Sequence, residues 1–344
     1  MKIAIHHRAN SYSEHWIKYC QTHNIQYKIV DAYANDIIEQ VTDCDAFMWH
    51  FHHCIHKDNL LAKQLIYVIE KQMGKITYPD YNTCWQFDDK ISQKYLLTAI
   101  GAPFVPTYIF YTRNEAVEWI KSTSFPKVFK LKIGASASNV QLIKSYKQAK
   151  RTINKAFGRG IKTFRYLGRI KEQLLKYKQG LVSIRNLLGL IKMWLLHICP
   201  NEFFRFHPNE IGYAYFQDFI PNNEFDIRVF IVNNKAIALK RMNRKNDFRA
   251  SGSGILIYDK DQIDENCIKM AFETNQKLQM QSVAFDFLHD NNGKPIITEI
   301  CYCRDNKNKG HKGYWSNDMQ WHKCDNINIC DWIIEGVIEK AHEQ

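Results

Sequence analysis

The sequence predicts an α/β protein with an open parallel sheet at its N-terminus and a mixture of strands and covering helices after it. Two observations predict this class. Strand-like and helix-like segments alternate over the first 80 residues, and several strand-like runs follow one another after residue 213. Hydrophobic residues make up 45% of the 344 residues and charged residues 24%, which is typical of a folded globular chain.

The first 80 residues contain four expected strands and three expected helices. The strands are 2–5, 26–30, 46–49 and 75–78, and the helices are 14–22, 36–41 and 60–72. In the last of these helices apolar residues recur at helical spacing, and Gly74 follows its end. Because parallel sheets bind ligands beyond the carboxyl ends of their strands, the loops after the first and third strands are candidate binding loops.

The rest of the chain predicts a connecting helix and two further lobes. Asp88-Asp89-Lys90 opens the helix, and Gly101 and Pro103 end it. Expected strands are 108–111, 127–132, 139–143, 213–219, 226–232, 235–241, 254–258, 283–288 and 295–300, with a helix over 265–279. The predicted domains are 1–85, 86–216 and 217–344, with a helical insertion over about 157–212.

Polar side chains gather after two strands of the N-terminal sheet. His6 and Arg8 follow the first strand, and His52 and His53 follow the third. One interpretation is a pocket for a polar or anionic substrate, because loops at these strand ends carry ligands. The other is a set of surface histidines with no shared partner, and their spacing matches no defined metal motif.

The positive charge of the chain is concentrated in one segment. The net charge is +12, and residues 144–205 contain 15 Lys and Arg against two Glu, so the remainder is nearly neutral. Amphipathic basic helices suit an anionic membrane surface or a lipid-pyrophosphate-linked substrate. A solvated basic insertion is the alternative, and no nucleic-acid-reading motif is present.

The chain begins without a recognisable secretory signal, so the sequence predicts a cytoplasmic protein, with possible association at the inner face of the membrane. In that compartment the ten cysteines are expected to be reduced thiols. The C-x-C and C-x₅-C spacings near the C-terminus do not match common structural zinc sites.

Two carboxylates on adjacent expected strands are the most specific chemical signal. Asp286 interrupts one apolar strand and Glu299 another, and the Asn292-Gly293 turn joins the two strands into a hairpin. Burying two like charges without a partner costs several kcal/mol, roughly, so a metal or a cation is expected beside them. A structural ion pair is the alternative to a Mg²⁺ site.

The order of the charged residues resembles the ATP-grasp superfamily, which includes D-alanine–D-alanine ligase and the ribosomal-protein glutamate ligases. The similarity runs from about Tyr78 to Tyr302 with the insertion excluded. It implies an ATP-grasp fold with an N-terminal Rossmann-like pre-ATP-grasp domain, and ATP and Mg²⁺ as cofactors. By the resemblance, Asp286 and Glu299 are the Mg²⁺ carboxylates.

The resemblance also implies which residues bind the nucleotide. Lys90 and Lys130 match the phosphate-binding lysines, and Glu224 matches the acceptor for the ribose hydroxyls. The hinge strand that meets the adenine edge corresponds to Gln217, Asp218, Phe219 and Ile220. The loop expected to close over the phosphates includes Ala135, Ser136 and Ser138.

A second set of residues resembles the glutamate-ligase branch in particular. Asp226-Ile227-Arg228, Lys240-Arg241 and Asp247-Phe248-Arg249-Ala250-Ser251 carry this similarity. It implies catalytic roles for Arg249 and for Lys240 or Arg241, which would stabilise the transferring phosphoryl group, and substrate contacts for Arg228 and Ser251. Which of Lys240 and Arg241 faces the phosphates depends on the strand register, because neighbours in a strand point to opposite faces.

One position departs from the family pattern. The family carries Asn two residues after the metal glutamate, as a further Mg²⁺ ligand, and this chain has Cys301. A thiol is a poor ligand for a hard cation. Either one metal site is weakened, or Asp305 or Asn306 supplies the oxygen. Cys301 also supports a further alternative, in which the protein binds a nucleotide but catalyses no reaction.

The C-terminal segment is similar to ATP-grasp proteins of bacterial surface-polysaccharide gene clusters. The similarity implies an amide bond formed on a sugar or amino-acid substrate. Tyr314 and Trp315 would then stack on a sugar face, although packing of the tail against the core is the alternative. The expected function is therefore a Mg²⁺-ATP-dependent carboxylate–amine ligase in capsule or lipopolysaccharide synthesis, and the alternative substrate is a peptide or protein.

Overall fold

The computed structural model describes residues 1–134, 139–163, 170, 173–174, 177, 182–196, 198, 206, 209–243, 247–249, 254–304 and 310–343. Two compact units divide the chain. Unit 1 comprises Met1–His53, Lys57–Pro106 and Ile220–Gln344, and unit 2 comprises Cys54–His56 and Thr107–Phe219. The first and last of the three predicted domains therefore contribute to the same compact unit.

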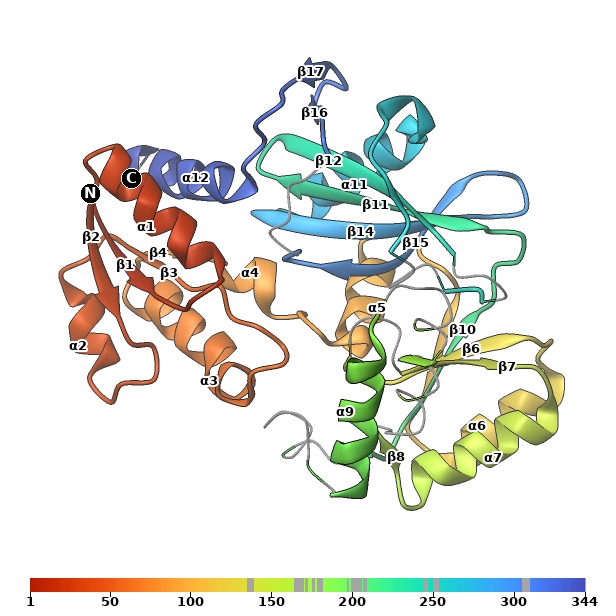
Figure 1. The fold of residues 1–344 in the computed structure, drawn as a ribbon. Coiled ribbons are helices and arrows are strands. Elements are labelled where there is room, and N and C mark those ends of the chain that lie inside the picture. The colour runs from red at the N-terminus through yellow and green to blue at the C-terminus, as the bar shows by residue number, and fades with distance from the viewer. Residues whose placement is uncertain are drawn as a thin grey trace. The chain divides into compact units, whose positions relative to one another are not determined.

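Unit 1 begins with a four-stranded parallel sheet in the order β2-β1-β3-β4. Its strands are β1 (Lys2–His6), β2 (Gln26–Val30), β3 (Ala46–Met48) and β4 (Ile76–Tyr78). The helices are α1 (Tyr12–Thr22), α2 (Ile37–Thr42), α3 (His56–Tyr67), which a π-helical turn η1 (Val68–Gln72) extends, and α12 (Ile329–Glu343). Figure 1 shows α1 and α12 on one face of this sheet and α2 and α3 on the other. The predicted strand–helix alternation is confirmed.

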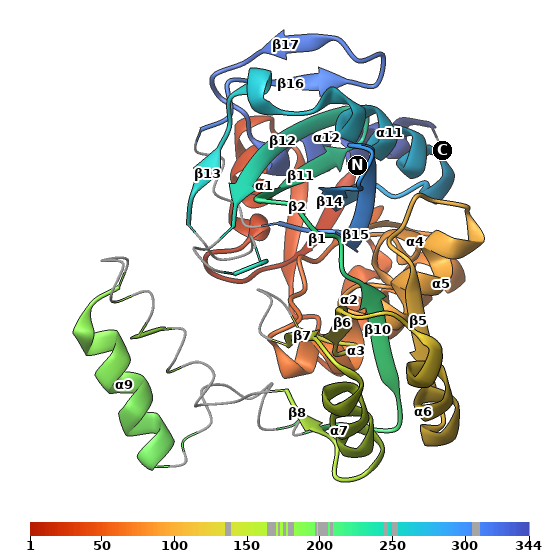
Figure 2. The same ribbon diagram turned by 90° about the vertical axis from the view of Figure 1, so that its right-hand side faces the viewer.

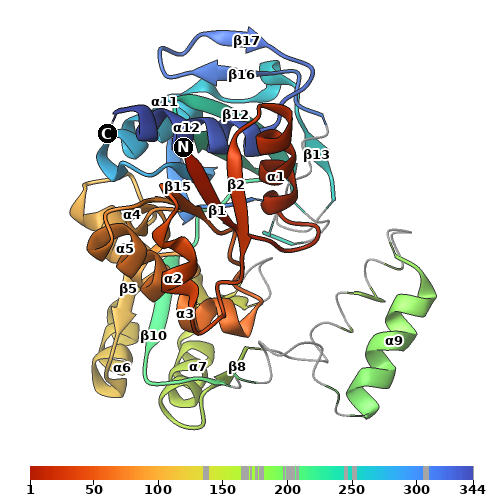
Figure 3. The same ribbon diagram turned by 90° about the vertical axis from the view of Figure 1, so that its left-hand side faces the viewer.

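The C-terminal helix was not predicted from the sequence. Figure 3 shows α12 beside α1, so the last helix of the chain covers the first sheet. Its buried residues include Ile333, Ile334 and Val337, and they join one core with Trp16 of α1. Burial of this apolar face against a distant segment stabilises the helix, which local signals in the sequence do not show.

The second sheet of unit 1 is larger and antiparallel. Six strands follow the order β15-β14-β11-β12-β16-β17, and β13 pairs with β12. The strands are β11 (Phe225–Val232), β12 (Lys235–Met242), β13 (Leu256–Ile257), β14 (Ser282–His289), β15 (Pro295–Cys301), β16 (Gly313–Ser316) and β17 (Trp321–Lys323). Helix α11 (Glu265–Leu278) packs on one face over a core that contains Ile227, Val229 and Phe285.

Two short helices connect the sheets of unit 1. They are α4 (Tyr81–Cys84) and α5 (Lys90–Ala99), and a 3-10 turn η2 (Lys260–Gln262) precedes α11. The Asp89 carboxylate accepts hydrogen bonds from the backbone N–H groups of Ile91 and Ser92 and so caps α5. This cap fixes Lys90 in the first turn of the helix, where its side chain is buried.

Unit 2 contains a four-stranded antiparallel sheet in the order β5-β10-β6-β7. Its strands are β5 (Thr107–Phe110), β6 (Lys127–Lys130), β7 (Val140–Ile143) and β10 (Ala214–Asp218). Two helices, α6 (Arg113–Ser122) and α7 (Tyr146–Phe157), lie side by side and cover one face (Figure 2). Their apolar residues and Phe129 and Phe216 of the sheet form the core of this unit.

The basic insertion also belongs to unit 2. Its described elements are the strand pair β8 (Ile161–Lys162) and β9 (Asn209–Glu210) and the helix α9 (Ile184–Leu195). The α9 helix falls within the predicted helical insertion, and the other helices expected there lie outside the described residues. Among the helices that the structure describes, none has the length and hydrophobicity to cross a bilayer.

Candidate active site

One face of the large sheet in unit 1 carries a cluster of charged side chains. Strand register places Asp226 opposite Arg241, Arg228 opposite Asp286, and Asp286 opposite Glu299. Directly opposed residues share a face, so all five side chains project from the same side of the sheet. The other side is the apolar surface under α11. The hairpin predicted from the sequence therefore places both carboxylates together.

The Asp286 carboxylate is bound by two arginines. Arg228 donates through Nε to Oδ1 at 2.6 Å and through Nη2 to Oδ2 at 2.7 Å. Arg241 Nη2 lies 2.9 Å from Oδ2 of the same carboxylate. Burial opposes ionisation of this group, but the two guanidinium groups outweigh it and hold the pKa of Asp286 well below its usual range. Asp286 is therefore a carboxylate at neutral pH.

Arg241 is shared between two acids. Its Nε and Nη2 donate to both oxygens of Asp226 at 2.6 Å, and the Arg241 side chain is only 9% exposed. Burial raises the pKa of Asp226, and Arg241 counteracts this. Asp226 belongs to the Asp226-Ile227-Arg228 motif, but the sequence alone does not assign it a role. Its alternation with Arg228 in an apolar strand was the signal that it shares the charged face.

The second predicted metal ligand, Glu299, is paired with a lysine from α5. Lys90 Nζ lies 3.0 Å from Glu299 Oε1, with the lysine side chain 6% exposed and the glutamate 35% exposed. Burial lowers the pKa of Lys90, but Glu299 and Asp88 reverse this, so the net shift is upward. The face thus contains three acids and three cations: Asp226, Asp286, Glu299, Arg228, Arg241 and Lys90.

Cys301 lies on this face as well. It pairs with Ala284 two residues before Asp286 on β14, and its thiol donates to the carbonyl oxygen of Cys303 at 3.0 Å. At position 301, where the ATP-grasp family has an Asn whose oxygen binds the metal, this chain therefore has a sulfur atom. Asp305 and Asn306, the two residues expected from the sequence to supply this oxygen instead, lie outside the described residues.

The strand register separates Lys240 from Arg241. Lys240 pairs with Ile227 on the opposite face of the sheet, and its ammonium group lies 3.9 Å from the centroid of the Phe225 ring. Arg241 is therefore the member of the pair that shares the face with Asp286. A second arginine proposed as catalytic, Arg249, forms an ion pair with Asp247, with Nη2 and Oδ2 2.6 Å apart.

Unit 2 carries Lys130, the second of the two predicted phosphate-binding lysines. Lys130 and Lys127 lie three residues apart on β6, so they project from opposite faces. Lys127 lies over the rings of Tyr108 and Trp119 and pairs with Asp218 at 2.5 Å. Lys130 lies opposite Tyr215, on the face away from α6 and α7.

The predicted adenine-binding strand includes the boundary between the two units. Gln217 is buried and donates to Thr107 Oγ1 at 3.2 Å, and Asp218 ends β10. Phe219 is the last residue of unit 2 and Ile220 the first residue of the final segment of unit 1.

The structure describes only some of the other residues that were predicted to bind the nucleotide or the substrate. Glu224, the expected ribose acceptor, has an exposed side chain just before β11. The phosphate-covering loop residues Ala135, Ser136 and Ser138, and the substrate residue Ser251, lie outside the described residues.

A polar cluster lies at the carboxyl ends of β1 and β3 in unit 1. Arg8 Nη1 lies 3.3 Å from Asp58 Oδ2, and its Nη2 lies 3.4 Å from Ser11 Oγ. Ser11 Oγ is 2.8 Å from His50 Nδ1. The His50 ring stacks on Tyr12 at 3.8 Å. Ser11 and His50 lie in the two predicted binding loops, whereas Asp58, which lies just after the second loop, was missed.

His50 has a polar atom without a partner. The backbone N–H of Tyr12 points to His50 Nδ1 at 3.5 Å, so Nδ1 is an acceptor and the proton of the neutral ring lies on Nε2. Within the described part of the chain this buried Nε2 has no hydrogen-bond partner. Burial, together with Arg8 and His52, lowers the pKa of His50 to about 3, so the ring is neutral.

The predicted substrate histidines have different environments. His6 is 7% exposed, accepts from the backbone N–H of Ala32 at 3.0 Å and contacts Tyr33 and Trp49 edge-on, which makes it a core residue. His52 and His53 are half-buried, with ring centroids 4.3 Å apart.

His53 connects the polar cluster with the charged face. Burial and then Lys90 lower the pKa of His53 to about 4, and Glu299 opposes this shift. Lys90 and Glu299 therefore lie near enough to His53 for their charges to shift its pKa. The same loop is anchored by Tyr302, whose hydroxyl donates to the Phe51 carbonyl at 2.6 Å. The candidate substrate loop and the candidate metal carboxylates thus lie close together within unit 1.

The C-terminal aromatic residues pack against the protein. Trp315 is 2% exposed and contacts Trp321 at 4.4 Å between ring centroids, so its ring face is not available to a sugar in this structure. Tyr314 stacks on His322 at 5.0 Å and contacts Trp332 of α12. The structure therefore favours the alternative in which these aromatic residues hold the β16–β17 hairpin in place.

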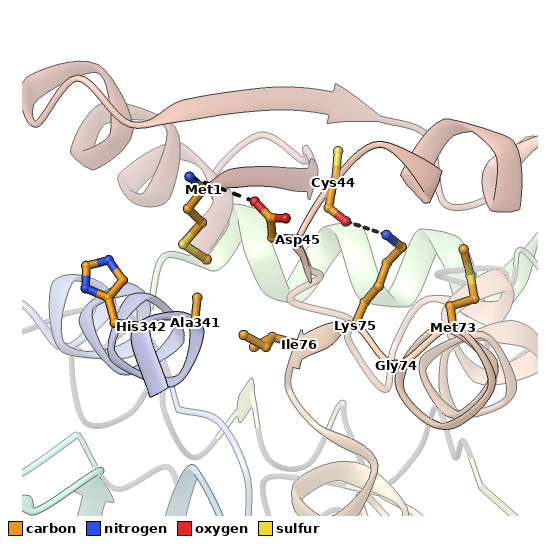
Figure 4. Close-up of a pocket in the computed structure, with 9 residues that line it drawn as sticks. All are labelled: Met1, Cys44, Asp45, Met73, Gly74, Lys75, Ile76, Ala341 and His342. Atoms are coloured by element: carbon orange, nitrogen blue, oxygen red, sulfur yellow. Dashed lines mark hydrogen bonds and ion pairs between the residues drawn. The ribbon is translucent and has the colours of Figure 1, made fainter. Parts of the chain in front are cut away.

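A hollow of about 450 Å³ lies elsewhere in unit 1 (Figure 4). Met1, Asp45 and Lys75 line it, and these residues precede β1, β3 and β4. It therefore lies at the amino ends of the parallel strands, whereas ligands of such sheets bind at the carboxyl ends. We do not associate this hollow with the active site.

The part of the chain that matches a known family includes the strands that carry the charged face of unit 1. Residues 209–313 match the family model described as a RimK-like ATP-grasp domain. No curated protein matches the chain.

Solved structures share the fold at low sequence identity. D-alanine–D-alanine ligase from Bacillus anthracis is 13% identical with a TM-score of 0.55, and the match covers 100% of this chain and 99% of that one. N5-carboxyaminoimidazole synthetase from Staphylococcus aureus, complexed with ADP, is 15% identical with a TM-score of 0.57, covering 98% and 76%. A RimK domain ATP-grasp protein from Sphaerobacter thermophilus is 11% identical with a TM-score of 0.51, covering 87% and 90%.

The chain has the ATP-grasp fold, which it shares with these ligase structures over nearly its whole length. Within that class, residues 209–313 are of the RimK-like type. The predicted α/β ATP-grasp fold is confirmed. Among the solved structures that share it are complexes with ADP and with MgADP, which agrees with ATP and Mg²⁺ as the expected cofactors.

The charged face of unit 1 fits these cofactors in part. Asp286 and Glu299 offer carboxylate oxygens, the ligands that Mg²⁺ prefers, and both form ion pairs with Arg228, Arg241 or Lys90. The sulfur of Cys301 does not fit a Mg²⁺ ion as an oxygen ligand does.

Proposed function

We propose that this protein is a Mg²⁺-ATP-dependent ligase that activates a carboxylate as an acyl phosphate and joins it to an amine. The substrate is a sugar or an amino acid in the synthesis of a bacterial surface polysaccharide. The observation that carries the proposal is the charged face of unit 1, where two carboxylates of the kind that bind Mg²⁺ are paired with arginine and lysine.

The residues of this face have distinct roles in the proposed reaction. Bound Mg²⁺-ATP supplies the γ-phosphoryl group that converts the substrate carboxylate into an acyl phosphate. Asp286 and Glu299 hold the metal through their oxygens. Arg241 and Arg249 offset the negative charge that develops during transfer. Lys130, in unit 2, binds the phosphates of the nucleotide.

No side-chain nucleophile is needed in this reaction, because the substrate carboxylate is the attacking group and the amine then displaces phosphate. Two thiols of unit 1 that lie outside the charged face, on α4 and α12, agree with this. Burial raises the pKa of Cys84 and Cys330 well above its ordinary value, so these thiols are not thiolates at neutral pH. We assign neither a catalytic role.

The polar cluster of unit 1 supports an anionic substrate group. His50 Nε2 is a buried donor that lacks an acceptor among the described residues, and an unpaired buried donor costs about 1–3 kcal/mol. A carboxylate oxygen satisfies such a donor, and Arg8 supplies a positive charge beside it. The influence of Lys90 and Glu299 on His53 supports a position for this substrate near the metal carboxylates.

The polysaccharide assignment depends on the similarity of the C-terminal segment to proteins of polysaccharide gene clusters. Since Trp315 is buried, this proposal derives sugar selectivity from polar side chains rather than from aromatic stacking. His311 is one candidate. It is 5% exposed, and its Nε2 lies 3.3 Å from Nη1 of Arg304, near the polar cluster.

A peptide- or protein-modifying amino-acid ligase is the second candidate. The RimK-like match and the Asp247–Arg249 pair in the segment that resembles the glutamate ligases favour it. A third reading, nucleotide binding without turnover, is supported by Cys301 at the position of a metal ligand.

Release of ADP and phosphate from Mg²⁺-ATP distinguishes these functions. The full chain is assayed with pairs drawn from sugar acids, amino sugars, amino acids and short peptides, and Glu299→Gln serves as the inactive control. Turnover with a sugar-containing pair supports the proposal, and turnover only with peptides favours the second candidate. ATP binding with no ADP formation for any pair contradicts both ligase functions and favours the third reading.

A further inference from the structure

The α9 helix (Ile184–Leu195) has an exposed apolar stripe within a basic segment. At 3.6 residues per turn, positions 184, 188, 191 and 195 share one side of the helix. Ile184 is 46% exposed, Leu188 58% and Leu195 65%, whereas Leu187 on the flank of the stripe is 7% exposed. Such exposure is unusual for three large apolar side chains in a row, because isolated rather than contiguous apolar residues are the norm on a soluble surface.

The apolar surface continues past the end of the helix. Trp194, in the last turn of α9, is 39% exposed, and beyond the helix Leu196 is 56% and Ile198 48% exposed. In Figure 2 the helix projects beyond the four-stranded sheet of its own unit, which agrees with these exposures. A Trp beside exposed leucines is the composition of helices that lie in a membrane interface.

Positive charge borders the stripe. Arg185 and Lys192 are exposed on the side of the helix next to it. Residues 144–205 as a whole carry 15 Lys and Arg and two Glu. Each basic residue near an anionic bilayer contributes about 1 kcal/mol of attraction, so apolar and electrostatic contributions act on the same segment.

A second copy of the chain is a poorer occupant for this surface. A two-fold contact through α9 would bring two strongly basic segments together and oppose association. A stable protein interface also buries about 800 Å² on each partner, which is more than one face of a 12-residue helix provides.

We propose that α9 docks this protein on the surface of an anionic lipid bilayer. The helix lies in the plane of the interface, with Ile184, Leu188 and Leu195 among the acyl chains and with Arg185 and Lys192 at the headgroups. The contact is peripheral and reversible, and it is independent of the ligase reaction.

The test is sedimentation of the full chain with vesicles. One set of vesicles is pure phosphatidylcholine, and the other contains phosphatidylglycerol. We expect binding to the anionic vesicles that weakens as salt rises. The double variant Leu188→Glu, Leu195→Glu is expected to bind on the order of tenfold or more weakly, because two buried apolar side chains are lost and two negative charges are added.

A matched control uses exposed apolar residues of unit 1. Leu60 is 63% exposed on α3 and Ile29 56% exposed on β2, so Leu60→Glu, Ile29→Glu makes the same chemical change away from α9. This control is expected to bind anionic vesicles as the unmodified protein does. Thermal unfolding of both variants checks that each is folded, which is expected because all four positions are exposed.

Three outcomes overturn the proposal. One is absence of binding to anionic vesicles at low salt. Another is equal loss of binding in the α9 variant and in the control, which would make the effect one of net charge alone. The third is a dimer in light scattering without lipid that the α9 variant abolishes, which would identify a second copy as the occupant of the stripe.

Discussion

Arg228 and Asp286 face each other on the adjacent strands β11 and β14 and form a bidentate ion pair, with N–O distances of 2.6 and 2.7 Å. Arg241 binds the same carboxylate from β12. The expected metal ligand is thus ionised and oriented by the chain itself.

Replacement of Asp286 by Asn is expected to lower the free energy of unfolding by about 3 kcal/mol, because the buried Arg241 and the half-buried Arg228 lose a charged partner. Urea unfolding measures this. Asp43→Asn removes surface ion pairs to Lys2 and Lys28 and should have little effect. A similar small change in both variants would contradict the importance of the buried network.

The contribution of Asp286 to stability is also expected to depend on pH. Since its pKa is lower in the folded protein, its stabilisation is present above the unfolded pKa of about 3.9 and is lost as the pH falls further toward the folded pKa. The difference between Asp286→Asn and the unmodified protein, measured by urea unfolding, should therefore be constant near neutrality and shrink below about pH 4.

Because His50 is buried and neutral, we expect its contribution to the free energy of unfolding to decrease at a higher pH than the contribution of Asp286 does. The pKa of His50 is lowered to about 3, so between about 6.5 and 3 the unfolded chain binds a proton that the folded chain does not. Stability from this group is complete above about pH 6.5 and decreases as the pH falls through that window. His50→Gln should flatten the pH dependence of unfolding between pH 6.5 and 4, roughly, and the exposed His342→Gln should not. Identical slopes for the two variants would be evidence against a neutral buried His50.

Glu299→Gln is expected to abolish ADP formation, by a factor of roughly 10³ or more, while ATP still binds. The reason is that Glu299 supplies an anionic oxygen to the metal, whereas other groups bind the nucleotide. Coupled ADP detection and calorimetric ATP titration measure the two effects. Glu273→Gln, on the exposed side of α11, is the matched control and should retain activity.

Cys301→Asn is expected to lower the Mg²⁺ concentration needed for turnover, because an amide oxygen replaces a sulfur that binds hard cations poorly. The unmodified protein should accordingly favour Mn²⁺ over Mg²⁺ more strongly than the variant does. Metal titrations of ADP formation measure the ratio. An unchanged ratio would show that residue 301 does not contact the metal.

The two lysines of β6 allow a matched comparison. Lys130→Met is expected to raise the KM for ATP by about tenfold or more, because it removes a charge that binds the phosphates. Lys127→Met breaks the pair with Asp218 and should mainly lower the melting temperature. If Lys127→Met raises the KM as strongly, the opposite faces of β6 do not separate the two roles.

Local patterns in the sequence determined much of the fold. The period of the apolar residues and the Asn-Gly turn identified the strands of the parallel sheet and the hairpin that bears Asp286 and Glu299. The α6 helix was missed although Thr112 and Glu115 form a capping box in the sequence, and the structure shows the Thr112 cap. That error came from an unused local signal.

Other features depended on the tertiary structure. The face on which Arg241 lies, and not Lys240, follows from pairing with β11, because a shift of one residue exchanges the two faces of a strand. The burial of Trp315 and the position of α12 beside α1 arise from packing between segments far apart in the chain. The sequence by itself determined which charges this protein carries and in what order. Only long-range pairing decided which of those charges meet, because side-chain contacts across a sheet depend on register and not on sequence distance.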